Sequence, residues 1–258
     1  MKKYFYLALC LILCFVFITA CGNDSVTPGT VTNLTQAQET PAETASEPTA
    51  EPEPEPTPEP TPAPEPPVEF NLGSLPVSIP GTIMMENGRE IKFELYPNVA
   101  PQAVFNFIYL ARDGFYDGLK FHRIMSGFMI QGGCPNSADG VDGLVGTGNP
   151  GWSILGEFAS NGIENDIAHV PGVLSMARGP DYNSAGSQFF IVHGNAAFLD
   201  RDYAGFGRVT EGMDVVDLIA ATPNNGPNGS VDPALMPTIT SITIDSDIVV
   251  PAPDKIMR

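Results

Sequence analysis

The distribution of proline sets the firmest limit on where this chain can fold. Glu-Pro and Thr-Pro pairs repeat from Glu47 through Pro67, and residues 22–69 contain no Lys or Arg. Proline has no backbone N–H and fixes φ, so this segment favours extended polyproline II geometry and cannot build a core. We therefore expect residues 21–69 to form a disordered acidic stalk, which at about 3.1 Å per residue reaches at most roughly 150 Å. The alternative, a Pro-rich ligand for a recognition module, lacks the basic flank that such ligands often carry.

The N-terminus reads as a targeting segment. Lys2 and Lys3 precede an uncharged apolar run, Tyr4 to Ile18, which at about 15 residues is shorter than the roughly 20 that a spanning helix needs. The sequence Ile-Thr-Ala-Cys that ends at Cys21 resembles the lipobox of a bacterial lipoprotein signal peptide. The resemblance implies a signal peptide over residues 1–20 and a lipid on Cys21. The chain would then be lipid-anchored on the extracytoplasmic face of the cell membrane; an ordinary secretory signal is the alternative.

The remaining cysteines argue against a disulfide-bonded protein, and the net charge argues against a nucleic-acid-binding protein. Cys10 and Cys14 lie in the expected signal peptide, so Cys134 is the one unmodified cysteine left and the mature protein has no internal disulfide. Twelve Lys and Arg against 30 Asp and Glu give a formal net charge of −18. Such a protein repels phosphate backbones, and we expect no nucleic-acid partner.

Residues 70–247 carry the patterns of a folded domain, and residues 248–258 read as a C-terminal tail. Apolar and polar residues alternate from Ile83 to Leu95 around Asn87-Gly88, the dipeptide favoured by a two-residue type I′ hairpin. Pro101 then opens a helix with apolar residues at helical spacing, and Gly114 ends it.

Shorter patterns follow, separated by turn residues. We expect strands at Leu119–Ile124, Phe128–Gln131, Val173–Met176, Gln188–Val192, Phe206–Val209 and Thr238–Ile244, and a second helix at Met213–Ala220. Seven or eight strands with two helices indicate an antiparallel barrel or sandwich rather than alternating βαβ units, and periodicity does not separate these two.

Three motif matches fail in their context. Residues 146–151 satisfy G-x-G-x-x-G, but no buried strand precedes them and no helix follows, so they do not indicate a dinucleotide site. His122, His169 and His193 are scattered and have no Cys cluster, and each is better read as a packed or hydrogen-bonded histidine than as a metal ligand. The serine-hydrolase motif lacks its final glycine after Ser153. We expect neither a metal nor a cofactor.

Two ordered blocks are far more specific. The first is Phe121–Gly133, FHRIMSGFMIQGG, and the second runs from Gly172–Arg178, GVLSMAR, to Ser187–Ile191, SQFFI. With Phe198-Leu199-Asp200 and the FGRV segment from Phe206, they strongly resemble the cyclophilin family of peptidyl-prolyl cis/trans isomerases over most of residues 81–245. The resemblance implies a mostly β fold, a closed eight-stranded antiparallel barrel capped by two α-helices, with the active groove on its outer face.

The chemistry of that family agrees with these residues. Amide resonance sets a barrier of about 18–20 kcal/mol to rotation about an X-Pro bond. A catalyst must bind the twisted amide better than either planar isomer, which requires an apolar slot for the proline ring and a fixed donor at the amide. Arg123, always protonated and fork-shaped, is suited to be that donor. Phe128, Met129, Phe190 and Leu199 are suited to form the slot.

The resemblance assigns the other groove residues. Gln131, with Arg123 the second catalytic residue, and the backbone at Arg178 would hold the carbonyls and amides that flank the proline. Ala177 and Gln188 would line a neighbouring pocket, of which the Gly-rich loop around Gly148 forms one wall.

Two positions depart from the common family pattern. Phe198 stands where many cyclophilins have tryptophan, and Tyr203 where many have histidine. A phenyl ring lacks the indole N–H, so we expect weakened binding of cyclosporin-like ligands with catalysis retained.

The sequence thus predicts a prolyl isomerase that acts on proline-containing peptides and unfolded exported proteins, and that is a monomer held at the membrane through lipid on Cys21. The alternative is a non-catalytic module or chaperone that binds proline-containing peptides in the same groove. Binding alone does not require an arginine at position 123, and this favours the enzyme.

Overall fold

The computed structural model describes residues 73, 75–226 and 228–257 of the 258-residue chain. The expected signal peptide (1–20), the lipid site Cys21 and the stalk to residue 69 lie outside these residues. Within the described part, no helix has the length and apolar character needed to cross a membrane.

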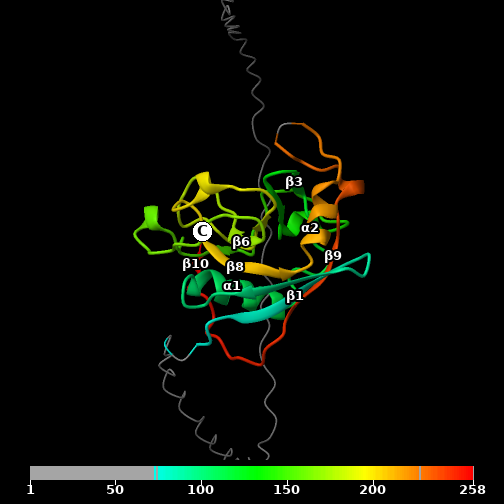
Figure 1. Cartoon of the computed structure of the whole chain (residues 1–258). Coiled ribbons are helices and arrows are strands. Elements are labelled where there is room, and N and C mark those ends of the chain that lie inside the picture. Colours follow the sequence, from blue (N-terminus) through cyan, green and yellow to red (C-terminus); the bar gives the residue numbers. More distant parts are fainter. Residues whose placement is uncertain (1–72, 74, 227, 258) are drawn as a thin grey trace, which may run out of the picture. The chain divides into compact units, whose positions relative to one another are not determined.

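Eight strands form one antiparallel sheet (Figure 1). Their order across the sheet is β3-β4-β7-β6-β8-β2-β1-β9. In chain order their bounds are β1 Ile79–Met85, β2 Glu90–Leu95, β3 Arg123–Met125, β4 Met129–Gly132, β6 Val173–Met176, β7 Phe189–Val192, β8 Gly205–Glu211 and β9 Ile239–Ile244. The expected mostly β class is confirmed, and so are the eight antiparallel strands.

The expected closed barrel needs correction. The edge strands β3 and β9 share no ladder, and the segments beside them are joined by the isolated bridge Lys120–Thr238. Backbone hydrogen bonds from Phe121 N to Pro237 O (2.9 Å) and from Ile239 N to Leu119 O (2.8 Å) flank that bridge. The eight strands therefore make a curled sheet whose edges meet through a few bonds. For the same reason the predicted strand at Leu119–Ile124 is extended chain up to residue 122, and β3 begins only at Arg123.

The first hairpin is present, but its turn is not type I′. A type I′ turn needs positive φ at both central residues, whereas Arg201 is the one non-glycine residue in the described part with positive φ. Gly88 has φ 76°, and Met85 N donates to Arg89 O at 2.9 Å. These features define a three-residue loop ending in a left-handed glycine, the other common hairpin connection.

Two α-helices pack on the sheet in the described part of the chain: α1 (Pro101–Arg112), which starts at the predicted Pro101 and ends before the predicted stop at Gly114, and α2 (Met213–Ala220), which has the predicted bounds. Helix α1 contacts β8 and β9, and α2 contacts β2, β3 and β4, so the two occupy separate places on the sheet (Figure 1). Short 3₁₀ turns complete the domain: η2 Pro135–Ser137, η3 Ala159–Asn161, η4 Ala197–Leu199 and η5 Pro233–Leu235.

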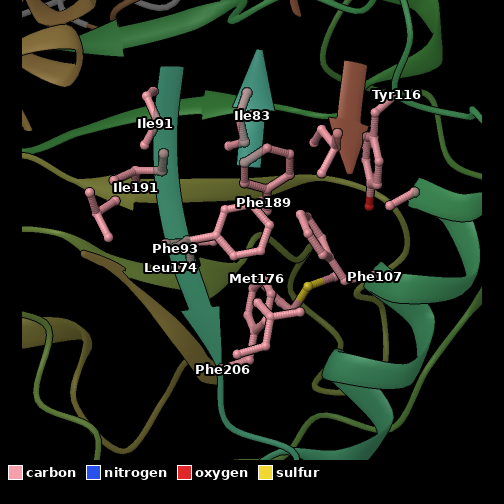
Figure 2. Close-up of a cluster of buried hydrophobic side chains, with 14 of the residues drawn as sticks. Ile83, Ile91, Phe93, Phe107, Tyr116, Leu174, Met176, Phe189, Ile191 and Phe206 are labelled. Atoms are coloured by element: carbon pink, nitrogen blue, oxygen red, sulfur yellow. The ribbon is translucent and has the colours of Figure 1, made fainter. Parts of the chain in front are cut away.

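Aromatic rings fill the space between α1 and the sheet. Phe107 of α1 lies with its ring centroid 5.8 Å from that of Phe93 on β2, and 5.3 Å from those of Phe189 on β7 and Phe206 on β8. Figure 2 shows these rings pointing toward one another. All four side chains are almost completely buried. One helix face thus covers the inner face of the curled sheet.

The C-terminal segment, set apart as a tail in the sequence analysis, pairs with the domain. Strand β10 (Ile256–Met257) lies antiparallel to β5 (Trp152–Ser153), a pair too short for sequence patterns to predict. The ammonium group of Lys255 lies 3.8 Å from the ring centroid of Trp152 and 4.4 Å from that of Tyr109 on α1. Gln102 and Asp254 exchange two further hydrogen bonds.

A carboxylate distant in sequence caps α1. Pro101 at the first helical position has no N–H, and the next two N–H groups, of Gln102 and Ala103, both donate to Glu157 at 2.9 Å. Glu157 is 2% exposed. Its burial outweighs these two hydrogen bonds and raises the pKa of its carboxyl to about 7. Glu157 therefore ties the loop before η3 to the start of α1.

Glu157 should give the domain a characteristic pH dependence. Its folded pKa lies above the usual value of 4.5, so the folded protein holds a proton that the unfolded chain has lost between those two pH values. The stability contributed by this proton is present below pH 4.5 and lost as the pH rises through 7. We expect the free-energy difference in unfolding between the wild type and Glu157→Gln to change by roughly 3 kcal/mol across this range.

Urea unfolding of both proteins at several pH values measures this change. Glu164→Gln, at an exposed position, is the matched control and should show no such change. A difference between the wild type and Glu157→Gln that stays constant from pH 4 to pH 8 would contradict the assignment.

Candidate active site

A cavity of about 240 Å³ on the outer face of the sheet gathers nearly all of the predicted groove residues. Gln188 is the exception and lines the neighbouring pocket described below. The cavity is lined by Arg123, Phe128, Met129, Gln131, Ala177, Arg178, Phe190, Phe198, Leu199 and Tyr203. These residues come from β3, β4 and the turn between them, β7, η4 and the loops after β6 and η4, so the sheet order brings together segments up to 80 residues apart.

Strand alternation separates this cavity from the main core. On β7, Phe189 and Ile191 belong to the main core, whereas Phe190 and Val192 belong to a second cluster on the other face. Met129 and Leu199 join that second cluster, and each is less than 8% exposed. The result is a firm apolar floor that fits a small apolar ring.

Phe128 and Phe198 form the exposed side of this slot. Their ring centroids lie 5.2 Å apart, and Phe198 is 70% exposed. An exposed aromatic pair beside an apolar floor leaves room for an additional ring to enter and be covered.

Arg123 is held over the slot by neutral acceptors. It lies opposite Gln131 in the β3–β4 ladder, and its Nη1 donates to Gln131 Oε1 at 3.2 Å. Its Nε donates to the Asn228 carbonyl at 2.9 Å, and Nη2 lies 3.2 Å from the sulfur of Met125. Burial lowers the pKa of Arg123, yet an arginine remains protonated at neutral pH. No ion pair found among the described residues includes Arg123, so its charge is not neutralised by a carboxylate.

Gln131 continues a chain of hydrogen bonds into a second cavity. Its Nε2 donates to Gln188 Oε1 at 2.9 Å, and Gln188 Nε2 donates to the carbonyls of Gly146 and Gly148, both at 2.9 Å. The second cavity, about 310 Å³, shares Gln131, Ala177 and Arg178 with the first and has the loop 146–149 as one wall. The two glutamines therefore fix the wall between the cavities.

The side chain of Arg178 has a structural role that the sequence did not reveal. Its guanidinium carbon lies 4.5, 5.1 and 5.2 Å from the ring centroids of Tyr203, Tyr182 and Phe158. Nε and Nη2 both donate to the Asp202 carbonyl, at 3.0 and 2.9 Å. The side chain thus joins three loops beside the two cavities that Arg178 lines.

His169 is also absent from the predicted site residues. It is buried and lies parallel to Phe190, with ring centroids 6.1 Å apart. Its Nδ1 lies 2.9 Å from Asp200 Oδ1, and its Nε2 lies 2.9 Å from Ser175 Oγ. Burial lowers the pKa of His169 more than Asp200 raises it. Both ring nitrogens of His169 thus have a hydrogen-bond partner, and its ring packs against the ring of Phe190.

The described residues hold no group of three His, Cys, Asp or Glu side chains placed to bind a metal ion. His193 accepts a hydrogen bond from Gly127 N at 2.8 Å and lies 3.1 Å from Asp217. His193 and His169 are therefore hydrogen-bonded histidines, as expected from the sequence.

Comparison with known proteins gives one consistent result. The family model described as "Cyclophilin type peptidyl-prolyl cis-trans isomerase/CLD" matches residues 82–244. Peptidyl-prolyl cis-trans isomerase B of Bacillus subtilis (strain 168) is 46% identical over 135 residues, which are 52% of this chain and 85% of that protein. The peptidyl-prolyl cis-trans isomerase of Helicobacter pylori is 42% identical over 135 residues, 52% of this chain and 76% of that protein.

Solved structures agree with this result. The crystal structure of a cyclophilin type peptidyl-prolyl cis-trans isomerase from Cryptosporidium parvum matches with a TM-score of 0.56 at 28% identity, and covers 66% of this chain and 99% of that chain. The same protein in the presence of the dipeptide Ala-Pro matches with a TM-score of 0.55.

The contacts of Arg178 predict how substitutions there affect stability. Arg178→Ala removes three cation–π contacts and three hydrogen bonds, and we expect it to lower the free energy of unfolding by about 2 kcal/mol. Arg178→Lys keeps the charge but not the planar fork, and should recover less than half of that loss. Urea unfolding measures both variants, with the exposed Arg208→Ala as control. Equal stability of the Lys variant and the wild type would show that charge alone matters.

Proposed function

Because the chain belongs to the cyclophilin-type peptidyl-prolyl cis-trans isomerase family and is a peptidyl-prolyl isomerase, we propose how and on what it acts. It accelerates rotation about Xaa-Pro bonds of exported proteins in the groove beside Arg123. Stabilisation of the twisted amide is electrostatic and hydrophobic, and no covalent intermediate forms. The placement of the unneutralised Arg123 guanidinium over an apolar slot carries this proposal.

The mechanism follows from the change in the amide during rotation. As the C–N bond twists, resonance is lost and an electron pair becomes localised on the prolyl nitrogen. A donor held near that nitrogen stabilises the twisted state more than either planar isomer, which lowers the barrier. Hydrogen bonds to Gln131 and Asn228 fix the Arg123 guanidinium before substrate arrives, so little reorganisation is needed.

The apolar slot and its rim hold the rest of the peptide. Met129, Phe190 and Leu199 receive the proline ring, and Phe128 with Phe198 covers it. Gln131 and the backbone at Arg178 hold the flanking amides. A similar structure obtained in the presence of the dipeptide Ala-Pro supports a proline-containing peptide as the ligand. Arg123 favours catalysis over holding alone, because simple binding of an apolar ring needs no cation.

The proposed location rests on the sequence before the domain. A lipid on Cys21 and an acidic, Pro-rich stalk over residues 21–69 would hold the isomerase on the extracytoplasmic face of the cell membrane. Its substrates there are unfolded exported proteins, and one copy of the groove suffices for each, so we propose a monomer.

Substitution of Arg123 tests the mechanism. Exchange between the cis and trans resonances of a short Xaa-Pro peptide, measured by NMR, should be accelerated by the wild type and slowed by Arg123→Ala about 100-fold or more in kcat/KM. Arg123→Lys keeps a positive charge but loses the fork, and should fall between the two. Arg208→Ala, at an exposed position on β8, is the matched control. Wild-type rates in Arg123→Ala would exclude the electrostatic mechanism.

Substitution of Cys21 tests the anchor. Cells that express the full chain in labelled palmitate should incorporate label into the wild type and into Cys10→Ser and Cys14→Ser, but not into Cys21→Ser. Incorporation is the readout because a variant that keeps an uncleaved signal peptide could still sediment with membranes. Label that persists in Cys21→Ser, or that is absent from the wild type, would contradict the lipoprotein assignment.

A further inference from the structure

A third cavity adjoins the proline slot and has no role in the proposed mechanism. Its volume is about 510 Å³, within the range of about 300–1,000 Å³ typical of ligand pockets. Arg123 and Gln131 line both this cavity and the slot, so the two adjoin at these side chains. Residues 143–147 form one wall and residues from 228 to 236 form another.

The lining of this cavity is mixed, and more of its surface is apolar than polar. Val231 and Met236 are buried at its base, and Val145 and Pro233 lie on its walls. Leu144 at the edge is 74% exposed and lies beside this apolar surface. An apolar side chain that entered here would cover Leu144 and be removed from water itself.

His122 keeps this apolar surface uncharged. The residue is 5% exposed, and burial lowers the pKa of its imidazole to about 4, so the ring is neutral at neutral pH. Neither ring nitrogen makes a hydrogen bond of good geometry, although the Lys120 carbonyl and the Gln188 side chain lie near enough to moderate the shift. Arg123, where the cavity meets the slot, is therefore the one cation among the described residues that line it.

The direction of the bound chain follows from the mechanism, on which this inference rests. Arg123 acts near the prolyl nitrogen and the prolyl carbonyl, and the chain leaves the proline through that carbonyl. The next residue therefore passes Arg123, where the third cavity begins. The second cavity shares Ala177 and Arg178 with the slot, and it meets the third cavity at Gln131, Gly146 and Thr147.

We propose that the third cavity is a specificity site for the side chain of the residue that follows proline, and that it favours large apolar or aromatic side chains. An acidic side chain at this position competes for the Arg123 guanidinium and slows turnover. The site thereby directs the isomerase toward Pro-apolar sequences, which unfolded chains expose and folded proteins bury.

Peptides that differ only after the proline test this site. NMR exchange measurements on Ala-Ala-Pro-Xaa, with Ala, Phe or Glu at the last position, give kcat/KM for each with the protein lacking its signal peptide. For the wild type we expect the Phe peptide to exceed the Ala peptide about tenfold, and the Glu peptide to fall below it. Equal values for the Phe and Ala peptides would overturn the inference.

Two substitutions at exposed positions of the lining probe the cavity itself. Ser230→Trp fills it and Leu144→Asp makes its edge anionic, and both should reduce the ratio of the Phe to the Ala peptide to about one. Leu218→Asp, at an exposed apolar position on α2, is the matched control and should keep the wild-type ratio. A ratio that stays unchanged in both cavity variants would overturn the inference.

The outcomes separate this inference from the proposed function. Acceleration of all peptides without a preference after the proline contradicts the specificity site and leaves the mechanism standing. No acceleration of any peptide contradicts both.

Discussion

The register of β7 between β4 and β6 is the constraint on which both the core and the groove depend. All four residues of β7 are buried, so each face of this strand has a separate set of partners. Phe189 packs against Phe107 in the core, and Phe190 stands opposite Gln131 and forms the floor of the slot. A shift of the β7 register by one residue would turn Phe190 toward the core and remove it from the floor of the slot. The same hydrogen bonds therefore position the stability-giving ring and the substrate-facing ring.

The charge in the groove depends on what surrounds Arg123 rather than on the arginine alone. Its partners are an amide oxygen, a backbone carbonyl and two thioether sulfurs. These acceptors fix the guanidinium without cancelling its charge, whereas a carboxylate in the same position would compete with the substrate. The network from Gln131 through Gln188 to the loop at Gly146 is likewise neutral. The Arg123 guanidinium thus meets walls that do not neutralise it, whereas the guanidinium of Arg178, which also lines the groove, packs against aromatic rings.

The sequence predicted those features that local patterns encode. The first helix starts at Pro101 and ends before Gly114 as expected, and the second has the bounds that its amphipathic spacing predicted. Ordered motif blocks indicated the groove residues, and the structure brings almost all of them together. The hairpin was expected, but its turn type was wrong, because Asn-Gly also fits a loop in which glycine alone is left-handed.

Features that depend on distant partners were not predictable in this way. Glu157 caps a helix that begins 56 residues earlier, and Arg178 meets rings from three different loops. His169 draws its two partners, Ser175 and Asp200, from different segments. The strand after Leu119 was placed too early, because the backbone there bonds to residues 237–239 instead of forming a ladder. Each of these contacts becomes visible only once the sheet is folded.

The C-terminal strand pairs with the strand that carries the single tryptophan, so the fluorescence of this residue is sensitive to that pairing. Trp152 is the only tryptophan of the chain, and it lies under Lys255 beside β10, with its Nε1 donating to Asn106 on α1 at 2.9 Å. Indole emission responds to a nearby cation and to solvent. Tryptophan emission of this protein therefore reports on the contact of Lys255 with Trp152, because the aromatic side chains that line the proline slot are phenylalanine and tyrosine.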